Sequence, residues 1–172
     1  MAGGANEKDN GLPKEELQRR AQMAKQLSGA FGDIVTILMR SQSERTRTLA
    51  DLEWMVVPAM QTGQFAVAEA QQKETGMVTP MGVVLWAWVS EAVDKRLSAQ
   101  LDKPMKLDPG EWKSGEIPWI VAAFGEPTVV NQLFQQLSKS VFTKTPAKLR
   151  ARDKDGKPFV GRLEFKTPTP SN

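Results

Sequence analysis

The segment from Ser41 to Arg47, SQSERTR, places hydroxyl, carboxylate and guanidinium side chains directly before an apolar helical pattern. The chain contains neither histidine nor cysteine. A general base in this segment would therefore be a carboxylate, a water molecule or an unusual lysine, and Glu44 is its only carboxylate. A polar loop before a buried helix can hold reactive groups, although an ordinary loop leading to a core helix explains the same residues.

The pattern that follows the loop predicts a helix. Apolar residues recur at three- and four-residue steps from Leu49 to Met60, which places them on one helical face. Thr48 suits the N-cap, and Asp51 adds negative charge to the first turn. Gly63 suits the turn after the helix. Pro58 requires the helix to kink or to end nearby.

Several short motifs follow one another in a characteristic order. They are Ser41 to Arg45, the Val57-Pro58-Ala59 step, the Gln64-Phe65 pair, MGVVLWAWVS at 81–90 and EWKSGEIPWIVAAFG at 111–125. In this order the chain resembles the toxin-activating lysine acyltransferases of RTX toxins, over about residues 31–165. That family shows a serine-proline-X-histidine-arginine run, a leucine-proline-alanine-like step, a glutamine-aromatic pair and a tryptophan-X-serine-glycine turn between strands.

The resemblance implies a fold and an activity. The fold would be a GNAT-like α+β single domain with a central, mostly antiparallel sheet flanked by helices. The activity would move a fatty acyl group from acyl carrier protein, where 4'-phosphopantetheine links it, to lysine side chains of an RTX protein. The implied partners are acyl carrier protein and the RTX protein, with no bound cofactor or metal, and a homodimer is left open. The chain lacks a glycine-X-glycine pyrophosphate loop, which argues against coenzyme A as the donor.

The chain departs from the family at both catalytic positions. The family's catalytic histidine falls on Glu44, and its catalytic aspartate falls on Trp119 or Ala122. Ser41 and Arg45 are kept. The resemblance therefore implies Glu44 as the replacement base, with Ser41 bonding the thioester carbonyl or carrying the acyl group transiently. The alternative is a catalytically degenerate member that acts as a binding or regulatory module.

Further residues are candidates for binding. Arg45, Trp86, Trp119 and Thr128 are expected to contact substrate: the tryptophans by lining an acyl slot, and Thr128 by capping a helix whose free amides face a phosphate. Tryptophans at strand spacing are also ordinary core residues. Lys144, Lys148 and Arg150 belong to a basic stretch near the C-terminal end. We expect these residues to dock the acidic carrier protein, although a solvent-exposed basic surface also explains them.

Composition limits the other function classes. The chain has 172 residues, 40% hydrophobic residues, 25% charged residues and a net charge of +3. These values suit one globular domain and do not indicate a nucleic-acid partner. The start lacks the pattern of a secretory signal, and no apolar run approaches a membrane span. We therefore expect a cytoplasmic protein.

The order of patterns predicts helices first, then strands, then a strand, a helix and a hairpin. We expect a disordered N-terminus at 1–11, an appended helix at 12–30 that ends near Ser28 and Gly29, the acyltransferase-like domain at 31–166, and a loose tail at 167–172. Strands are expected in 65–70, 77–89 and 117–124, with a hairpin around Asp155-Gly156 near the end.

Overall fold

The computed structural model describes residues 12–164. The expected disordered N-terminus at 1–11 and the expected tail at 167–172 lie outside these residues.

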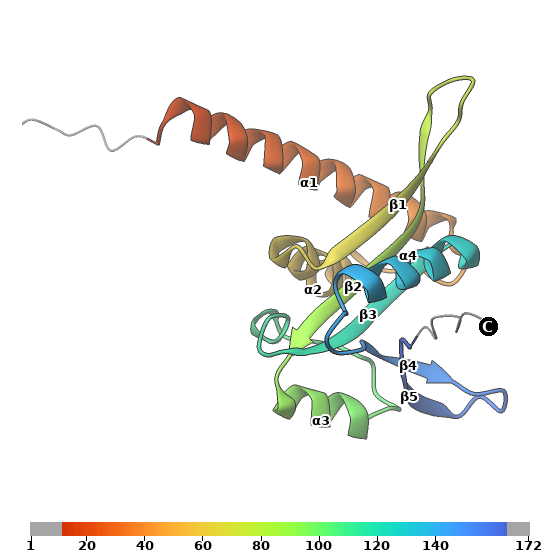
Figure 1. The fold of residues 1–172 in the computed structure, drawn as a ribbon. Coiled ribbons are helices and arrows are strands. Elements are labelled where there is room, and N and C mark those ends of the chain that lie inside the picture. The colour runs from red at the N-terminus through yellow and green to blue at the C-terminus, as the bar shows by residue number, and fades with distance from the viewer. Residues whose placement is uncertain (1–11, 165–172) are drawn as a thin grey trace, which may run out of the picture.

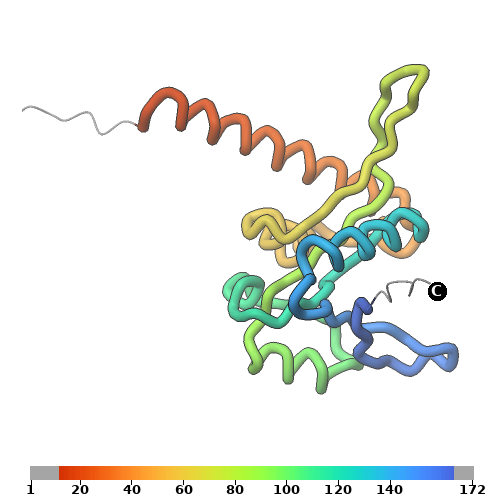
Figure 2. Tube along the Cα trace, in the orientation of Figure 1, coloured from red at the N-terminus to blue at the C-terminus, as the bar shows by residue number. Residues whose placement is uncertain are grey.

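A single long helix, α1 (Lys14–Arg40), opens the described chain. The expected break near Ser28 and Gly29 is wrong, because the helix runs through both residues. One glycine inside a helix costs only about 1 kcal/mol relative to alanine, and the Ser28 hydroxyl donates to the Ala24 carbonyl within the same helix (3.0 Å). The C-terminal half buries Ile34 and packs on the sheet, whereas the N-terminal half extends away from the body (Figures 1 and 2).

The second helix, α2 (Leu49–Thr62), has the expected ends. Thr48 accepts a hydrogen bond from the Asp51 amide at 3.3 Å, and the Asp51 carboxylate accepts one from the Thr48 amide at 2.8 Å. This reciprocal pair is a capping box. Gly63 follows the helix with φ of 70°, the left-handed conformation that glycine favours. The helix continues past Pro58 to Thr62, whose hydroxyl donates to the Pro58 carbonyl (2.8 Å).

Five strands in the described chain form one sheet in the order β1-β2-β3-β4-β5. The strands are β1 (Phe65–Gln71), β2 (Val78–Val89), β3 (Ile117–Gly125), β4 (Lys148–Arg152) and β5 (Pro158–Arg162). All neighbours are antiparallel except β3 and β4, which are parallel. The predicted α+β class with a mostly antiparallel sheet is confirmed, and the arrangement is consistent with a GNAT-like single domain.

Helices cover both faces of this sheet. One core cluster joins α1, α2 and α3 (Glu91–Ala99) to Val83, Leu85 and Ala87 of β2. The alternate β2 residues Val84 and Trp86 pack in a second cluster with α4 (Pro127–Ser140) on the opposite face. This two-residue alternation is what a strand buried on both faces requires. A short 3-10 turn, η1 (Pro109–Glu111), interrupts the connection between α3 and β3. Within residues 12–164, no helix combines the length and apolar character needed to cross a bilayer.

The capping box gives a first prediction. Thr48→Ala removes the side-chain acceptor of the α2 N-cap, and we expect the free energy of unfolding to fall by about 1 kcal/mol. Thermal denaturation should then show a melting temperature lower by roughly 2–4 °C. Thr46→Ala, an exposed neighbour in the same loop, serves as the control. An equal melting temperature for the two variants would contradict a stabilising cap.

The Asp51 carboxyl gives a pH-dependent prediction. Hydrogen bonds from the Thr48 backbone and side chain lower the pKa of Asp51 below its ordinary value. The ionised carboxylate therefore favours the folded state above the unfolded pKa of about 3.9, and this contribution is lost as pH falls through the folded pKa.

Urea unfolding at several pH values would measure this effect. We expect native protein to exceed Asp51→Asn in stability at neutral pH, and the difference to close as pH falls below about 4. Glu53→Gln, an exposed residue of the same helix, is the matched control. A difference that stays constant from neutral pH to strongly acidic pH would argue against the stated cause.

Candidate functional site

The loop between α1 and α2 is an ordered series of turns. The Ser41 amide ends α1 by donating to the carbonyls of Ile37 and Leu38. The Ser41 carbonyl then accepts from the amides of Glu44 (3.2 Å) and Arg45 (3.0 Å). The side chain of Glu44 is therefore held close to the end of α1, whereas Arg45 is exposed.

The carboxylate of Glu44 is largely covered and has fixed partners. Its side chain is 16% exposed. The Ser43 hydroxyl donates to one carboxylate oxygen (3.0 Å), and Arg47 donates to the other in an ion pair. The Arg47 guanidinium also lies over the Phe124 ring, 5.4 Å from its centroid. Because Phe124 belongs to β3, this contact ties the Glu44 loop to the end of the central sheet.

A cavity of about 190 Å³ lies beside the loop. It is enclosed by the end of α1, the start of β2 and the turn from β3 into α4, and Ser41 lines it. Glu44 is not among its lining residues. The β2 backbone passes so close to Gly125 that a Cβ there would lie 2.2 Å from the Met81 carbonyl oxygen, and Gly125 also has φ of +117°. Only glycine fits at this position. The lining residues are Ile37, Arg40, Ser41, Pro80, Met81, Gly125 and Glu126.

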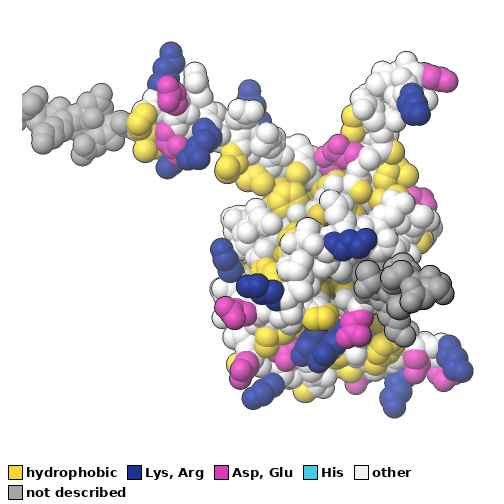
Figure 3. Space-filling view, in the orientation of Figure 1, with side chains coloured by type: hydrophobic (Ala, Val, Ile, Leu, Met, Phe, Trp, Pro, Cys, Tyr) yellow, Lys and Arg dark blue, Asp and Glu magenta, His cyan; other side chains and the backbone are white. Residues whose placement is uncertain are grey.

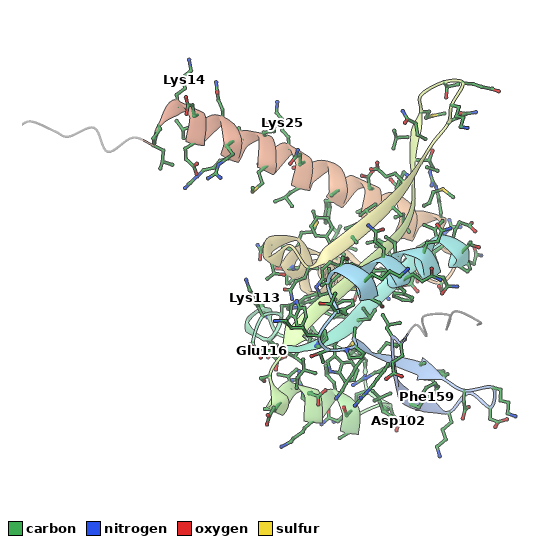
Figure 4. All side chains as sticks on the ribbon, viewed as in Figure 1. Lys14, Lys25, Asp102, Lys113, Glu116 and Phe159 are labelled. Atoms are coloured by element: carbon green, nitrogen blue, oxygen red, sulfur yellow. The ribbon has the colours of Figure 1, made fainter. Side chains whose placement is uncertain are left out.

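A larger cleft opens where β3 and β4 separate. The two parallel strands have a single registered pair, Trp119 with Lys148. Beyond this pair lies a cavity of about 350 Å³. Its lining combines apolar side chains, from β3 and from the segment after α3, with cationic side chains from that segment and from β4. Its lining is Leu101, Lys103, Met105, Ile120, Val121, Arg150, Ala151, Arg152 and Pro158. Figure 4 labels Asp102 and Phe159, the sequence neighbours of three of these residues (Leu101, Lys103 and Pro158), at this end of the molecule.

One carboxylate holds the closed end of the cleft together. Asp94 of α3 accepts a hydrogen bond from the Trp119 indole at 2.8 Å, and the Lys148 ammonium contacts its two oxygens at 2.7 and 2.9 Å. Lys148 also lies 5.9 Å from the centroid of the Trp119 ring. The side chains of Lys148 and Asp94 are only 21% and 15% exposed. Asp94 therefore joins α3, β3 and β4 at the one point where the two strands are paired.

A protein-family model matches most of this chain. The family model described as the RTX toxin acyltransferase family matches residues 23–161, well over half of the sequence. The chain belongs to the RTX toxin acyltransferase family. Membership supports a toxin-activating acyltransferase function in general, with an RTX toxin as the substrate. No curated protein sequence matches the chain significantly.

The two tryptophans expected at the acyl slot of this family member lie in the core. Trp119 is completely buried, and Trp86 is 6% exposed. Trp86 meets the Phe142 ring edge to face, with centroids 5.8 Å apart. Neither tryptophan is among the residues that line the two cavities. Their direct contact with substrate stays a prediction.

Thr128 does not cap α4, contrary to the sequence prediction. The helix begins at Pro127, and Glu126 occupies the N-cap. Proline is favoured at the first helical position, which moves the start one residue earlier than a threonine cap would place it. Thr128 is exposed in the first turn of α4, and its contact with substrate also stays a prediction.

The three predicted carrier-docking cations differ in their surroundings. Lys144 is exposed. Lys148 is paired with Asp94, and Arg150 donates to the carbonyls of Leu97 and Lys103. Figure 3 shows cationic and acidic side chains interspersed over the visible face of the body. Docking of a carrier protein on these residues stays a prediction.

Sequence reasoning missed Asp94 and Lys103. Asp94 follows the Ser90 cap of α3, a place where an acid is explained by the helix dipole alone. Its partners lie 25 and 54 residues away, beyond the reach of local periodicity. Among residues 12–164, no group of three or more acidic side chains gathers as a metal site.

The Asp94 cluster gives a third prediction. Asp94→Ala leaves the Lys148 ammonium and the Trp119 indole without their acceptor, and we expect a loss of about 2–3 kcal/mol in the free energy of unfolding. The melting temperature should fall by roughly 4–12 °C. Asp102→Ala is the control, because Asp102 is exposed. Similar melting temperatures for both variants would show that Asp94 does not hold the cleft.

Proposed function

We propose that this protein transfers a fatty acyl group from the phosphopantetheine arm of acyl carrier protein to lysine side chains of an RTX protein in the cytoplasm. The observation that carries the proposal is the cleft where β3 and β4 separate. Its volume of about 350 Å³ falls in the range of small-molecule sites. Leu101, Met105, Ile120 and Val121 provide apolar surface for an acyl chain.

The reaction requires a neutral amine, a polarised carbonyl and a route for one proton. Lysine has a reference pKa of about 10.4, so its ammonium must lose a proton before it attacks. The amine nitrogen then bonds to the thioester carbon and gives up one of its two remaining protons, the carbon–sulfur bond breaks, and the pantetheine thiolate leaves and takes up one proton in exchange. An amide on the RTX lysine and a free carrier thiol are the products.

Glu44 is the candidate proton acceptor. A carboxylate has about four lone-pair sites, and Ser43 and Arg47 each contact one oxygen of Glu44. These contacts fix the orientation of the carboxylate and leave sites on it for an amine proton. The contact with Arg47, whose guanidinium also lies over the Phe124 ring, keeps the carboxylate beside the end of β3.

Ser41 is the candidate donor to the thioester carbonyl. It lines the cavity beside the loop, and its hydroxyl lies 3.2 Å from that of Ser43. A hydroxyl can rotate toward an oxyanion as charge develops there. Direct attack by lysine on the donor is preferred to an acyl-serine intermediate, because no histidine is present to activate the serine.

A second candidate function is a binding or regulatory module that keeps the fold. The indole of Trp119, one of the two positions where the resemblance places the family's catalytic aspartate, is buried and bonded to Asp94. In addition, the ion pair with Arg47 already occupies the Glu44 carboxylate. Both observations favour a structural use of the former catalytic positions.

Substitution of Glu44 separates the two functions. If Glu44 is the base, Glu44→Gln should lower the rate of acyl transfer by roughly 10²–10⁴-fold. The assay combines the protein, acylated carrier protein and an RTX protein, and reads the mass increase on lysine. Glu53→Gln, an exposed glutamate of α2, should retain the native rate.

A native rate in Glu44→Gln would exclude Glu44 as the base. Absence of lysine acylation by the native protein, in an assay where another family member is active, would overturn the enzyme proposal. A binding module would instead retain its affinity for the RTX protein after Glu44→Gln.

A further inference from the structure

A second pocket adjoins the cleft, between α3 and β4. Its volume is about 300 Å³, and the end of α3, the segment that follows it, and Arg150 of β4 enclose it. Cationic side chains dominate the lining, and among residues 12–164 no acidic side chain contributes to it. The lining consists of Arg96, Leu97, Gln100, Lys103, Pro104, Lys106 and Arg150.

Most of this positive charge is not neutralised within the described chain. Arg96 forms an ion pair with Glu111 (2.7 Å). Within residues 12–164, no ion pair is formed by Lys103, Lys106 or Arg150. Burial, followed by the nearby charge of Arg96, lowers the pKa of Arg150 below the ordinary arginine value. An anion in the pocket would relieve this unfavourable concentration of positive charge.

Arg150 is held in a fixed position at the pocket wall. Its Nε and one terminal nitrogen donate to the Leu97 carbonyl at 3.2 and 2.8 Å, and the other terminal nitrogen donates to the Lys103 carbonyl at 2.6 Å. A guanidinium has five N–H donors, so two remain for a ligand. A planar guanidinium that is already ordered suits the oxygens of a phosphate group, and loses little conformational freedom when it binds one.

The pocket and the cleft share Lys103 and Arg150 as lining residues. A ligand can therefore place an anionic group among the cations and extend a less polar chain toward Met105, Ile120 and Val121. This is the distribution of charge along an acylated pantetheine arm, which has a phosphodiester at one end and the thioester-linked acyl chain at the other.

The start of α4 is less suited to a phosphate, although a helix N-terminus often binds one. Pro127 has no amide hydrogen, and Glu126 places negative charge at the N-cap. Both features disfavour an anion at that point.

From these observations we propose that the pocket formed by Arg96, Lys103, Lys106 and Arg150 binds the phosphodiester of the donor's pantetheine arm, with the arm continuing from the pocket into the β3–β4 cleft. This assignment rests on the proposed function, because it assumes a carrier-linked donor. The pocket supplies affinity for the phosphate, and the reacting carbonyl is held elsewhere.

A matched pair of ligands tests the assignment directly. 4'-Phosphopantetheine and pantetheine differ only by the phosphate, and NMR titration of the full chain gives a dissociation constant for each. We expect the phosphorylated ligand to bind on the order of tenfold more tightly, and the preference to weaken with added salt. Lys103→Ala and Lys106→Ala should each reduce the preference severalfold.

Lys154→Ala is the control, because Lys154 is exposed in the turn between β4 and β5 and does not line the pocket. The lysine variants are chosen ahead of Arg150→Ala because Arg150 joins β4 to the end of α3 and its loss would disturb the fold. Inorganic phosphate that binds as tightly as 4'-phosphopantetheine would overturn the assignment to the donor arm.

The acyl-transfer assay distinguishes failure of this inference from failure of the proposed function. If native protein acylates lysine while Lys103→Ala and Lys106→Ala keep the native KM for acylated carrier protein, the phosphate site is wrong and the function stands. If native protein transfers no acyl group but prefers the phosphorylated ligand, and the lysine variants lose that preference, the pocket assignment stands and the enzyme proposal fails.

Discussion

The carboxylate of Asp94 is the contact on which the geometry of the cleft depends. β3 and β4 share one registered pair, which is too little pairing to fix the angle between two strands. Asp94 adds a charged hydrogen bond to Lys148 and a hydrogen bond to the Trp119 indole at that pair. Charge-assisted bonds of this kind are stronger than those between neutral groups. The strands are therefore joined at one end and free to separate at the other, which leaves space for a ligand inside the sheet.

The Glu44 loop shows how a change of residue type alters the electrostatics of a site. A glutamate stands where the resemblance places a histidine, and an anion requires a counter-charge when water is largely excluded. Arg47 provides that charge, and its guanidinium also lies on the Phe124 ring. The same arginine thus balances Glu44 and anchors the loop to β3. The Glu44 carboxylate is therefore held in a fixed position, and one of its oxygens is already occupied by Arg47.

Local sequence signals were sufficient for much of the fold. The α2 cap and the turn at Gly63 follow from short-range chemistry, and the structure has both. Local signals misplaced the start of α4, because Pro127 competes with Thr128 for the helix end. They also placed a helix end at Gly29. The structure has no break there, because the small helical penalty of one glycine is outweighed by the packing of the later part of α1 on the sheet.

The candidate site was less accessible from sequence. The order of motifs indicated the family and the loop, but it did not distinguish tryptophans in the core from tryptophans in a pocket, since the same spacing serves both. The Asp94 cluster and the cationic pocket each join segments about 50 residues apart. Such contacts depend on the way the β4–β5 hairpin returns to α3, which no local pattern specifies.

The length of α1 gives the molecule two regions of very different stability within one element. No side chain of residues 14–26 is buried, and Leu17 and Met23 are 52% and 56% exposed; Lys14 and Lys25 point away from the body in Figure 4. A free helix of this length is marginal in water. Backbone amides should therefore exchange with solvent rapidly in this arm and slowly around Ile34, and cleavage within the arm would leave the sheet and its covering helices intact.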